Sequence, residues 1–481
     1  MGDFNFIGGS STTRSRVFDA QETINLYPEQ SGSGTSKNIA MLIGTPGLAL
    51  WKLLEGGGIR GMLRFSPTLA IVVAGANVYR VTSLGVATLL GTTFPRTTPV
   101  SMDSNGVQVM LVTGPEGYVI DPVLGTFSQI TDPAFRGADR VVFVDGYFAF
   151  NAPGTDEYQI TALNSTSLDA LDIGTAEGSP DALVTVATNS RDLWLLGETS
   201  TELAQNTGNI DFPFERIQGV FIEHGCAAKY SVAKAMDPTG ASRLFWLAAD
   251  ERGQGIVVAS GGYQVGRIST HAVEYSLGRL ARIDDAIGFT YQQEGHTFYV
   301  LTLPTGNVTW VYDLGTQLWH KRAWRSPLTG NLNRHRANCV MAFAGQILVG
   351  DFELPRVYRW SLDVFDDAGD PLPAIRQAPH VAREDGRWLI YDRFWLDMET
   401  GVGLVSGQGS DPMVLLEWSD DGGATFTGQR LLPAGKLGER KRRAIARRLG
   451  KSRDRVFRVT ITDPIPRYLV NADVETRRAT A

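Results

Sequence analysis

The stretch that decides the fold spans residues 193–234 and reads LWLLGETSTELAQNTGNIDFPFERIQGVFIEHGCAAKYSVAK. It opens with a four-residue apolar run closed by Gly197, which is too short for a helix and predicts a strand. The polar segment that continues to Gly208 predicts a loop, and Pro213 excludes a helix or a central strand beside it. β-type residues resume over 217–222. The local pattern is therefore a short strand, a turn and another strand.

This pattern recurs along the chain at a nearly constant spacing. Strand-like runs end in a glycine turn at four positions separated by 39, 40 and 43 residues, namely Gly75, Gly114, Gly154 and Gly197. Three comparable runs follow less regularly, at residues 244–249, 298–304 and 340–350. A repeat of about 40 residues is the length of one four-stranded propeller blade. Since a closed ring protects strand edges that an open sheet would expose, the sequence predicts a mainly β fold with a propeller of six or seven blades.

The remainder of the chain divides around this repeat. Residues 1–57, which include the run SGSGTS, predict an irregular N-terminal arm, and their apolar pieces imply that parts of the arm pack on something. The propeller is expected over 58–385. Residues 386–481 predict a smaller, platform-like C-terminal β domain that carries a basic segment. Helices should be short, and the best candidates are 276–284 and 440–449.

Composition places the protein in a broad class. The 481 residues are 43% hydrophobic and 20% charged, which is ordinary for a globular protein. Two cysteines cannot make a disulfide framework, so packing must stabilise the fold. No run reaches the roughly 18 apolar residues of a membrane span, and the start lacks the basic and apolar regions of a signal peptide. We expect no membrane anchor.

The net charge of −6 is unevenly distributed. Residues 436–458 contain 11 Lys and Arg against two acids, a net charge of +9, so the rest of the chain carries −15. An acidic majority argues against a free-standing DNA-binding protein, which normally presents a basic face. The basic segment also lacks interleaved stacking aromatics. A protein contact is the first interpretation, a solvated face the second and DNA phosphates the third.

One local motif resembles the Asp-box hairpin of sialidase-type propellers. It has the form S-x-D-x-G-x-T, with residues Ser419, Asp421, Gly423 and Thr425. Asp421 can accept backbone hydrogen bonds in such a turn, while Gly423 supplies a positive φ. The motif is a turn device and carries no catalysis, so we interpret these four residues as structural.

The rest of the sequence offers only weak candidates for catalytic residues. A glycosidase needs two carboxylates about 5 to 9.5 Å apart, and the adjacent acids at 250–251 and 284–285 are the obvious pairs. Neighbours on a strand point to opposite faces, so solvated turn acids are the preferred interpretation. His224 and Cys226 invite a metal or nucleophile reading, yet no second Cys/His cluster lies near them in sequence. We therefore predict no catalytic residue, no metal ligand and no cofactor.

Three segments carry a resemblance to a known family: the opening stretch, Val142–Leu163 (VFVDGYFAFNAPGTDEYQITAL), and Leu449–Glu475 with its run RDRVFRVTITDPIPRYLVNADVE. They are similar to the packaged-DNA stabilisation proteins, also called tail hub or nozzle proteins, of short-tailed double-stranded-DNA phages. The segments sample the middle and the end of the chain, so the resemblance extends over its length. One departure is Ala204, which stands where the resemblance implies an aromatic residue.

The resemblance implies a structural, non-enzymatic protein of the virion tail, made in the host cytoplasm. Such a protein forms a ring of six copies below the portal and its adaptor, extends the DNA channel and helps retain packaged DNA until ejection. Its partners would be copies of itself, the portal–adaptor complex, and tailspike and tail-needle proteins, with DNA passing through without sequence-specific binding. The alternative is a carbohydrate-binding or sialidase-like propeller protein.

Within this interpretation, the basic segment is expected to contact a neighbouring subunit or the adaptor ring. The residues expected to make that contact are Arg440, Lys441, Arg442, Arg443, Arg447 and Arg448.

Overall fold

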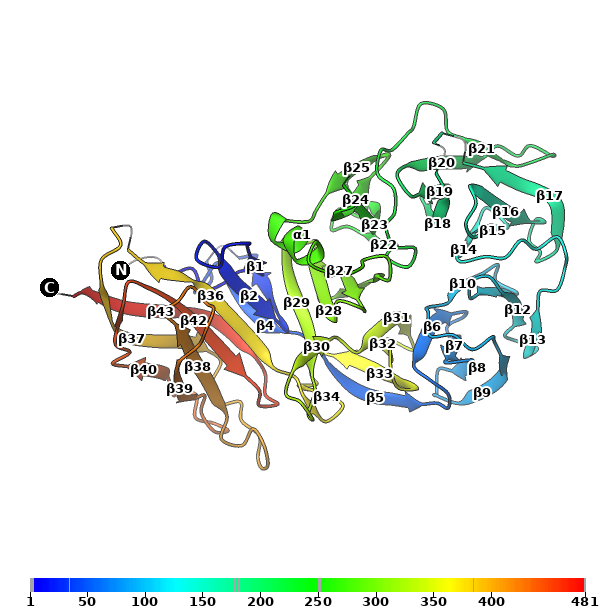
Figure 1. The fold of residues 1–481 in the computed structure, drawn as a ribbon. Helices are drawn as coiled ribbons and strands as arrows, with labels where there is room; N and C mark the ends of the chain where they lie inside the picture. Colours follow the sequence, from blue (N-terminus) through cyan, green and yellow to red (C-terminus); the bar gives the residue numbers. More distant parts are fainter. Residues whose placement is uncertain are drawn as a thin grey trace.

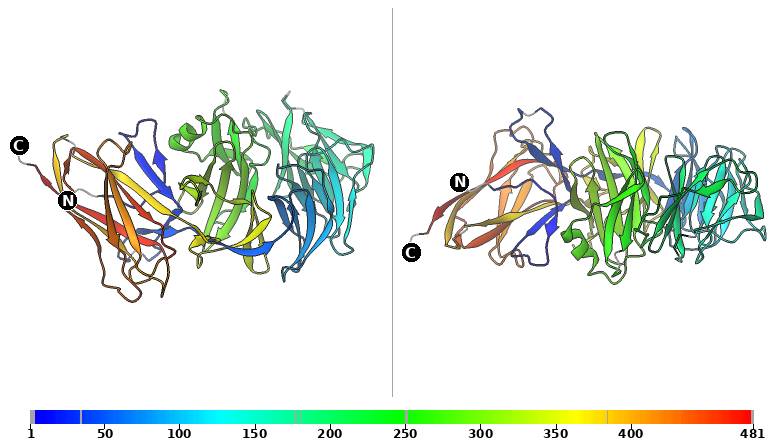
Figure 2. Two further views of the ribbon diagram at one scale, coloured as in Figure 1. Left: turned by 60° about the horizontal axis from the view of Figure 1, so that its bottom comes forward. Right: turned by 90° about the horizontal axis from the view of Figure 1, so that it is seen from above.

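The structure, a computed structural model, describes residues 4–33, 35–176, 178–179, 181–249, 252–383 and 385–479. Its regular secondary structure is almost entirely β, and it has two units side by side, a propeller and a β-sandwich, as Figures 1 and 2 show. Over these described ranges, the α-helix content is the seven-residue α1 (His271–Leu277). No helix there is long and apolar enough to cross a membrane.

Seven four-stranded blades form the propeller within the described part of the chain, so the prediction of six or seven is resolved to seven. Each blade runs from an inner to an outer strand. Blades one to three are β6 (Ile59–Arg64), β7 (Leu69–Ala74), β8 (Asn77–Thr82), β9 (Ala87–Thr92); β10 (Ser101–Ser104), β11 (Val109–Val112), β12 (Gly117–Asp121), β13 (Thr126–Gln129); and β14 (Val141–Val144), β15 (Tyr147–Asn151), β16 (Glu157–Thr161), β17 (Leu168–Thr175).

Blades four to seven complete the ring. They are β18 (Leu183–Asn189), β19 (Asp192–Gly197), β20 (Thr201–Asn206), β21 (Phe214–Arg216); β22 (Ala233–Met236), β23 (Ser242–Ala249), β24 (Gly255–Gly261), β25 (Gln264–Arg267); β26 (Ile287–Gln293), β27 (His296–Leu303), β28 (Val308–Asp313), β29 (Leu318–Arg325); and β31 (Ala337–Phe343), β32 (Gln346–Asp351), β33 (Arg356–Ser361) with β5 (Gly47–Leu53).

The glycine repeat marks the second strand of successive blades. Gly75, Gly114 and Gly154 follow β7, β11 and β15 directly or closely, and each has a positive φ, between 54° and 76°, that favours glycine. The later repeats are less regular because longer connections enter between blades, including the one that contains α1. This helix overlaps the predicted 276–284 only at its last two residues.

The opening stretch differs from its prediction at one point. Residues up to Gly208 were expected to form a loop, but Thr201–Asn206 form β20, the third strand of blade four. Leu203 and Ala204 of this strand are buried and pair with β19. The polar residues around them made the segment look like a loop in the sequence. As Pro213 requires, the following strand β21 lies at the outer edge of its blade.

The propeller is closed by the N-terminal part of the chain. β5 is the outermost strand of blade seven and runs antiparallel to β33, with Gly47 opposite Ser361 and Leu53 opposite Arg356. Trp360 donates its indole N–H to the carbonyl of Pro46 at 3.0 Å, and Leu48 is fully buried beside it. Blade seven is thus assembled from the two ends of the propeller segment, which ties them together.

The sandwich has two facing sheets. One contains β36 (Ala374–Ala382), β42 (Asp454–Ile461), β38 (Met413–Ser419) and β39 (Gly428–Pro433), and the other contains β3 (Leu26–Gln30), β4 (Ala40–Gly44), β43 (Tyr468–Arg478), β37 (Leu389–Met398), β40 (Ala444–Arg447) and β41 (Lys451–Ser452). Their inner faces enclose a core that includes Phe394, Leu416 and Phe457. The helix considered for 440–449 does not form: it is a turn followed by β40.

The N-terminal residues are more ordered than the irregular arm expected for 1–57. They contain β1 (Ser11–Thr12), β2 (Ala20–Ile24), β3, β4 and β5. The apolar pieces noted in the sequence become β3 and β4 of the sandwich. Short strands also lie at the boundary, β30 (Leu332–Arg334), β34 (Asp366–Asp367) and β35 (Asp370–Pro371), where β34 pairs in parallel with β5.

β2 joins the two units into one continuous sheet. It pairs in parallel with β29 of blade six at Ile24, and antiparallel with β36 of the sandwich. The next residue, Asn25, is fully buried with φ 54°. Its amide donates to the carbonyls of Ala323 and Pro373, both at 2.8 Å, and its Oδ1 accepts from the N–H of Ala323 at 2.9 Å. Asn25 therefore bridges propeller and sandwich.

We predict that Asn25→Ala lowers the free energy of unfolding by about 2–4 kcal/mol, because buried backbone groups lose their partners and alanine is strained at this φ. Asn25→Gly should be less destabilised, because glycine accepts the φ while losing the same hydrogen bonds. Urea unfolding of both variants measures the difference, with Asn209→Ala in an exposed loop as control. Equal loss in all three variants would contradict the bridging role.

A buried histidine also fastens the N-terminal strands to the propeller. His296 of β27 lies 2.9 Å from Asp313 through Nδ1 and 2.5 Å from Glu29 of β3 through Nε2. The hydrogen bond to Asp313 is the largest cause that raises the pKa of His296, to about 9, against the opposing effect of burial. Its imidazolium form is therefore the form that the fold stabilises.

Because the pKa of His296 is raised on folding, its contribution is complete below the ordinary pKa near 6.5 and is lost as pH rises through about 9. We expect the wild-type protein to lose stability over this interval by at most about 1.4 kcal/mol per pH unit from this group. His296→Gln should flatten that slope. Chemical unfolding at a series of pH values tests this, and parallel curves for the two proteins would refute it.

Candidate contact surface

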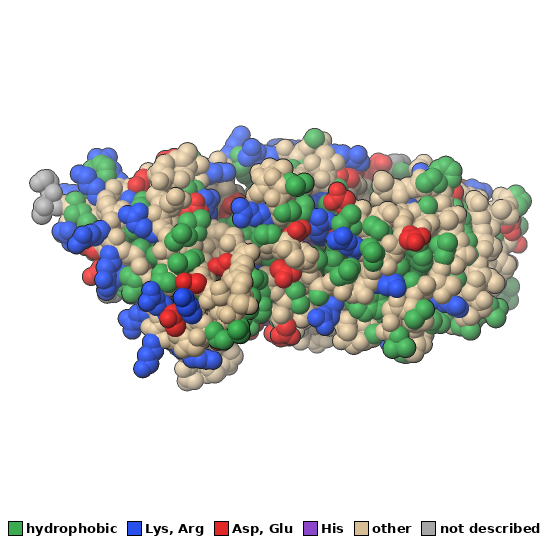
Figure 3. Space-filling model, turned by 90° about the horizontal axis from the view of Figure 1, so that it is seen from below, with side chains coloured by type: hydrophobic (Ala, Val, Ile, Leu, Met, Phe, Trp, Pro, Cys, Tyr) green, Lys and Arg blue, Asp and Glu red, His purple; other side chains and the backbone are tan. Residues whose placement is uncertain are grey.

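The six basic residues expected to make a contact lie together on the sandwich. Arg440–Arg443 lie in the turn and loop before β40, Arg447 ends that strand, and Arg448 follows it. All six side chains are exposed, and none forms an ion pair with another described residue. Figure 3 shows Lys and Arg side chains gathered at the sandwich end of the molecule. We call these six residues the basic cluster.

The charge asymmetry follows the division into two units. Residues 375–477 contain 18 Lys and Arg against 14 Asp and Glu, so the sandwich is basic although the whole chain carries −6. Charges that remain exposed and unpaired keep their long-range field for a partner, weakened by salt beyond about 10 Å. The sandwich segment therefore carries a net charge of +4, whereas the rest of the chain carries −10.

Other cations of the 436–458 segment are engaged within the molecule. Lys436 lies 3.5 Å from Asp411, and Arg458 forms a two-pronged pair with Glu417 at 2.9 Å. Arg455 is only 2% exposed. The sequence had treated the whole segment as one contact surface. The structure separates the exposed basic cluster from three engaged cations, Lys436, Arg455 and Arg458, whereas Lys451 and Arg453 are exposed over the ring of Trp388.

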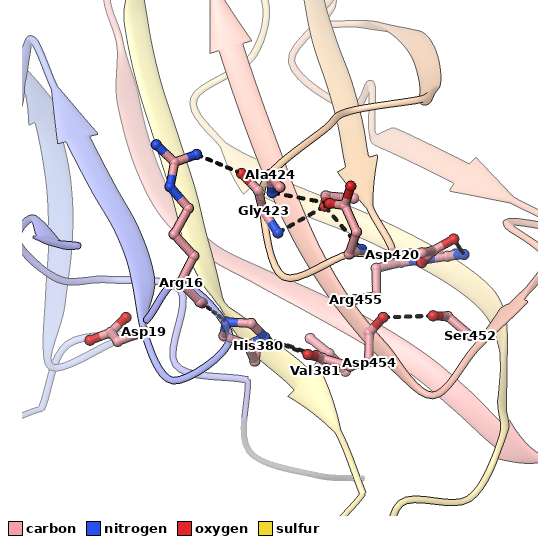
Figure 4. A network of polar contacts seen from close by, with 12 residues as sticks. Arg16, Asp19, His380, Val381, Asp420, Gly423, Ala424, Ser452, Asp454 and Arg455 are labelled. Atoms are coloured by element: carbon pink, nitrogen blue, oxygen red, sulfur yellow. Dashed lines mark hydrogen bonds and ion pairs between the residues drawn. The ribbon is translucent and has the colours of Figure 1, made fainter. Parts of the chain in front are cut away.

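Arg455 organises the base of this region (Figure 4). Its guanidinium donates to both oxygens of Asp420, at 2.7 and 2.8 Å, and to the carbonyl of Leu449 at 2.6 Å. It also lies 4.3 Å from the ring centre of Tyr391. A planar guanidinium suits this combination of a forked carboxylate and an aromatic face. The chain that leaves the basic cluster at residue 449 is thereby fixed to the sandwich.

The Asp-box-like turn lies next to Arg455. The Ser419 hydroxyl donates to Asp421 at 2.6 Å and accepts the N–H of Gly423 at 2.8 Å. Asp421 Oδ1 accepts the N–H groups of Ala424 and Thr425, and its Oδ2 accepts the Thr425 hydroxyl. Donation from Ser419 and Thr425 lowers the pKa of Asp421. Both carboxylate oxygens are therefore used inside the turn.

His380 connects this region to the N-terminal segment. Its Nδ1 lies 2.8 Å from Asp454, and its Nε2 lies 2.8 Å from the carbonyl of Arg16, whose side chain donates to the carbonyl of Gly423 (Figure 4). Both ring nitrogens face acceptors, so the doubly protonated ring satisfies both. The hydrogen bond to Asp454 is the largest cause that raises the pKa of His380.

One exposed aromatic at this surface escaped the sequence analysis. Trp388 is 43% exposed, and the cations of Lys451 and Arg453 lie 5.3 and 5.4 Å from its ring centre. Aromatic and arginine side chains are enriched at the centres of protein interfaces. The signal available in the sequence was a tryptophan beside a charged loop, but its two cations come from residues more than 60 positions away.

The alternative catalytic groups are not brought together. Asp284 pairs with Arg282 at 2.7 Å, whereas Asp285 accepts from Thr305 in another turn. The pair Asp250 and Glu251 lies outside the described residues.

His224 and Cys226, the candidates for a metal site or a nucleophile, do not form a reactive site either. Burial raises the pKa of Cys226 to about 11, so its thiol is held protonated, and His224 lies on the same connection. Among the described residues, no group of three or more His, Cys, Asp or Glu is placed to hold a metal.

Two protein-family models match the chain almost end to end. The description "Bacteriophage P22 Gp10, beta-propeller" covers residues 3–364, and "Bacteriophage P22 Gp10, beta-sandwich" covers residues 375–477. The chain belongs to the bacteriophage P22 Gp10 family. This is the family of the tail hub or nozzle protein of short-tailed phages, as the resemblance had indicated, and it identifies a structural protein of the phage tail. No curated protein matched the sequence.

Solved structures resemble the propeller at low identity. One is the extracellular domain of a protein named as the hybrid two component system BT4673 from B. thetaiotaomicron, with 9% identity and a TM-score of 0.45, covering 65% of this chain and 39% of that one. Another, YCF48 bound to D1 peptide, has 13% identity, a TM-score of 0.39, and covers 66% and 97%. The Neurospora crassa Pan2 WD40 domain has 8% identity, a TM-score of 0.41, and covers 63% and 89%.

We predict that Arg455→Ala lowers the free energy of unfolding by about 2–3 kcal/mol, less than for a fully buried pair because the Asp420 side chain is 40% exposed. Amide hydrogen exchange should also rise over residues 447–453, which lose their anchor at Leu449. Arg453→Ala, two residues away and exposed, is the matched control. Unchanged exchange in Arg455→Ala would contradict the anchoring role.

Proposed function

We propose that this member of the P22 Gp10 family is a ring-forming tail hub that continues the DNA channel below the portal and adaptor and helps retain packaged DNA until ejection. Six copies would form the ring, with tailspike and tail-needle proteins as further partners. The observation that carries this proposal is the exposed basic cluster on the sandwich, in a chain whose family is that of the tail hub. The virion tail is the corresponding location.

The basic cluster is proposed to face an acidic surface of a neighbouring subunit or of the adaptor ring. The side chains are free to pair, and their backbone is held by the Arg455 network described above. Charge complementarity of this kind sets the register of an interface and speeds assembly more than it adds affinity. Arginine is suited to the task because its planar fork binds carboxylates with two hydrogen bonds.

DNA is proposed as a passing cargo and not as the ligand of the cluster. Outside the 436–458 segment the chain carries a net charge of −15. If such surfaces line the channel, they repel phosphate and allow DNA to slide without being trapped. If the basic cluster bound DNA phosphates instead, counterions would be released and the affinity would depend steeply on salt concentration.

A carbohydrate-directed function receives little support from the geometry of the Asp-box-like turn. The Asp421 carboxylate accepts hydrogen bonds from its own turn through both oxygens, which matches a structural role for that residue.

The test reverses two charges of the basic cluster. In Arg442→Glu/Arg443→Glu, we expect slower and weaker co-assembly with portal–adaptor rings, because two attractive contacts become repulsive. Sedimentation or negative-stain microscopy of mixtures measures this, and the defect of assembly rate should shrink at high salt.

The matched control is Arg64→Glu/Arg279→Glu, which makes the same charge change at exposed propeller positions. It should assemble normally. If the cluster variant assembles normally but has lost a steeply salt-dependent affinity for DNA, the contact proposal is wrong and nucleic-acid binding replaces it.

A further inference from the structure

Blades three and four carry a large excess of acidic residues. Residues 141–216, which form these two blades, contain 12 Asp and Glu against two Lys and Arg, a net charge of −10. With +9 on residues 436–458, the remainder of the chain carries only −5. The tail-hub proposal requires an acidic partner surface for the basic cluster and does not say where that surface lies.

Four of these acids lie on the outer edge of the two blades. Asp169 and Asp172 belong to β17, Glu215 belongs to β21, and Asp211 lies in the turn before β21. Asp172 is half-exposed and the other three are exposed. The ion pairs within these blades use other acids, and none of the four pairs with another described residue. We call these four residues the acidic edge.

Asp172 reports on the absence of a neighbouring cation. Its partial burial and the charge of Asp169 raise its pKa. A carboxylate that lay beside a cation would shift the other way. The negative charge of the acidic edge is therefore not neutralised within the described chain.

The parts of the acidic edge lie side by side and include exposed apolar side chains. Phe212, in the turn before β21, packs against Tyr158 of blade three with ring centres 5.8 Å apart, and the Tyr158 ring lies over Gly174 of β17. The turn therefore lies against β17. Ile210 and Leu171, next to the acids, are 98% and 86% exposed. Apolar side chains this exposed beside charged groups favour an interface over a merely solvated face.

The acidic edge and the basic cluster lie at opposite ends of the molecule. Blades three and four form the end of the propeller away from the sandwich, whereas the basic cluster lies on β40 and its flanking residues at the sandwich end (Figure 1). The two surfaces therefore cannot meet within one chain. Because each surface repels its own kind, the complementary contact is between the acidic end of one copy and the basic end of another.

We infer that the acidic edge of one copy binds the basic cluster of the next copy, head to tail. The planar forks of the arginines suit the carboxylates of the edge, and the exposed Leu437 beside the cluster gives it an apolar group to set against Ile210 and Leu171. A contact between two different surfaces repeats from copy to copy and closes into a ring when the rotation allows. This inference rests on the ring proposed above and selects the neighbouring subunit as the partner of the cluster.

Charge reversal on each surface tests the contact. Asp211→Lys/Glu215→Lys and Arg442→Glu/Arg443→Glu each reverse one side of it. In either variant, the protein concentration at which rings on portal–adaptor complexes are half complete should rise about tenfold or more, as mass photometry can measure. An equal mixture of the two variants should recover assembly, because in an alternating ring native surfaces meet native ones and reversed surfaces meet reversed ones.

The matched control is Glu55→Lys/Glu294→Lys, which makes the same charge change at two exposed propeller acids that have no ion pair in the described chain. It should assemble like the wild-type protein. Mixing it with Arg442→Glu/Arg443→Glu should not correct the defect of the arginine variant.

The outcomes separate this inference from the tail-hub proposal. If the wild-type protein forms no rings on portal–adaptor complexes, both are wrong. If it does, and the acidic-edge variant assembles equally well or mixing restores nothing, this inference alone is wrong. A defect confined to the arginine variant would then assign the basic cluster to the adaptor.

A milder variant keeps the test decisive if the lysine variant fails to fold. Asp211→Asn/Glu215→Gln removes the two charges with almost no change in side-chain size. It should raise the half-assembly concentration by about threefold or more while the circular dichroism spectrum stays unchanged. Assembly of this folded variant at the wild-type concentration would overturn the inference.

Discussion

The pairing of β5 with β33 is the constraint on which the rest of the structure depends. It joins residues near position 50 to residues near position 358, and without it blade seven would have three strands and an open edge. Closing so long a segment costs conformational entropy that grows only slowly with its length, and the ring of packed blades offsets it. The same pairing places the start and the end of the propeller side by side, so that the flanking segments must leave together.

The sandwich is built from those flanking segments. Its sheets combine β3 and β4 from the N-terminal side with strands from residue 374 onward, and β2 continues blade six into the sandwich. Arg376 shows how closely the two ends are joined. Its buried guanidinium donates to the carbonyls of Phe6 and Gly9 and to the side chains of Gln21 and Thr23. The sandwich is therefore not formed by one continuous segment of the chain. The basic cluster lies on a domain that is built from both the N-terminal and the C-terminal parts of the chain.

The sequence predicted features that depend on local chemistry. The propeller could be read from the 40-residue period, because each blade repeats a buried second strand and a glycine turn such as those at Gly75 and Gly114. The part played by β5 could not, because its partner is 300 residues away and nothing local identifies it. The same limit applies to the basic segment. Arg453 and Arg455 look alike in sequence, and two positions apart on one continuous strand they would share a face. Arg453 instead lies in the bend between β41 and β42 and is exposed, whereas Arg455 lies in β42 and is buried against Tyr391.

The joint formed by β2 also has a mechanical consequence. Its ladder with β36 has three residue pairs, whereas its ladder with β29 has one, Ile24 opposite Lys321. A force that pulls the propeller away from the sandwich therefore meets unequal resistance on the two sides of β2. On the β29 side the load is shared by the single ladder position, by the carboxamide of Asn25, which bonds Ala323 through both its nitrogen and its oxygen, and by the pairs Lys321–Glu22 and His296–Glu29. The joint therefore depends on side-chain contacts on its propeller side and on backbone pairing on its sandwich side.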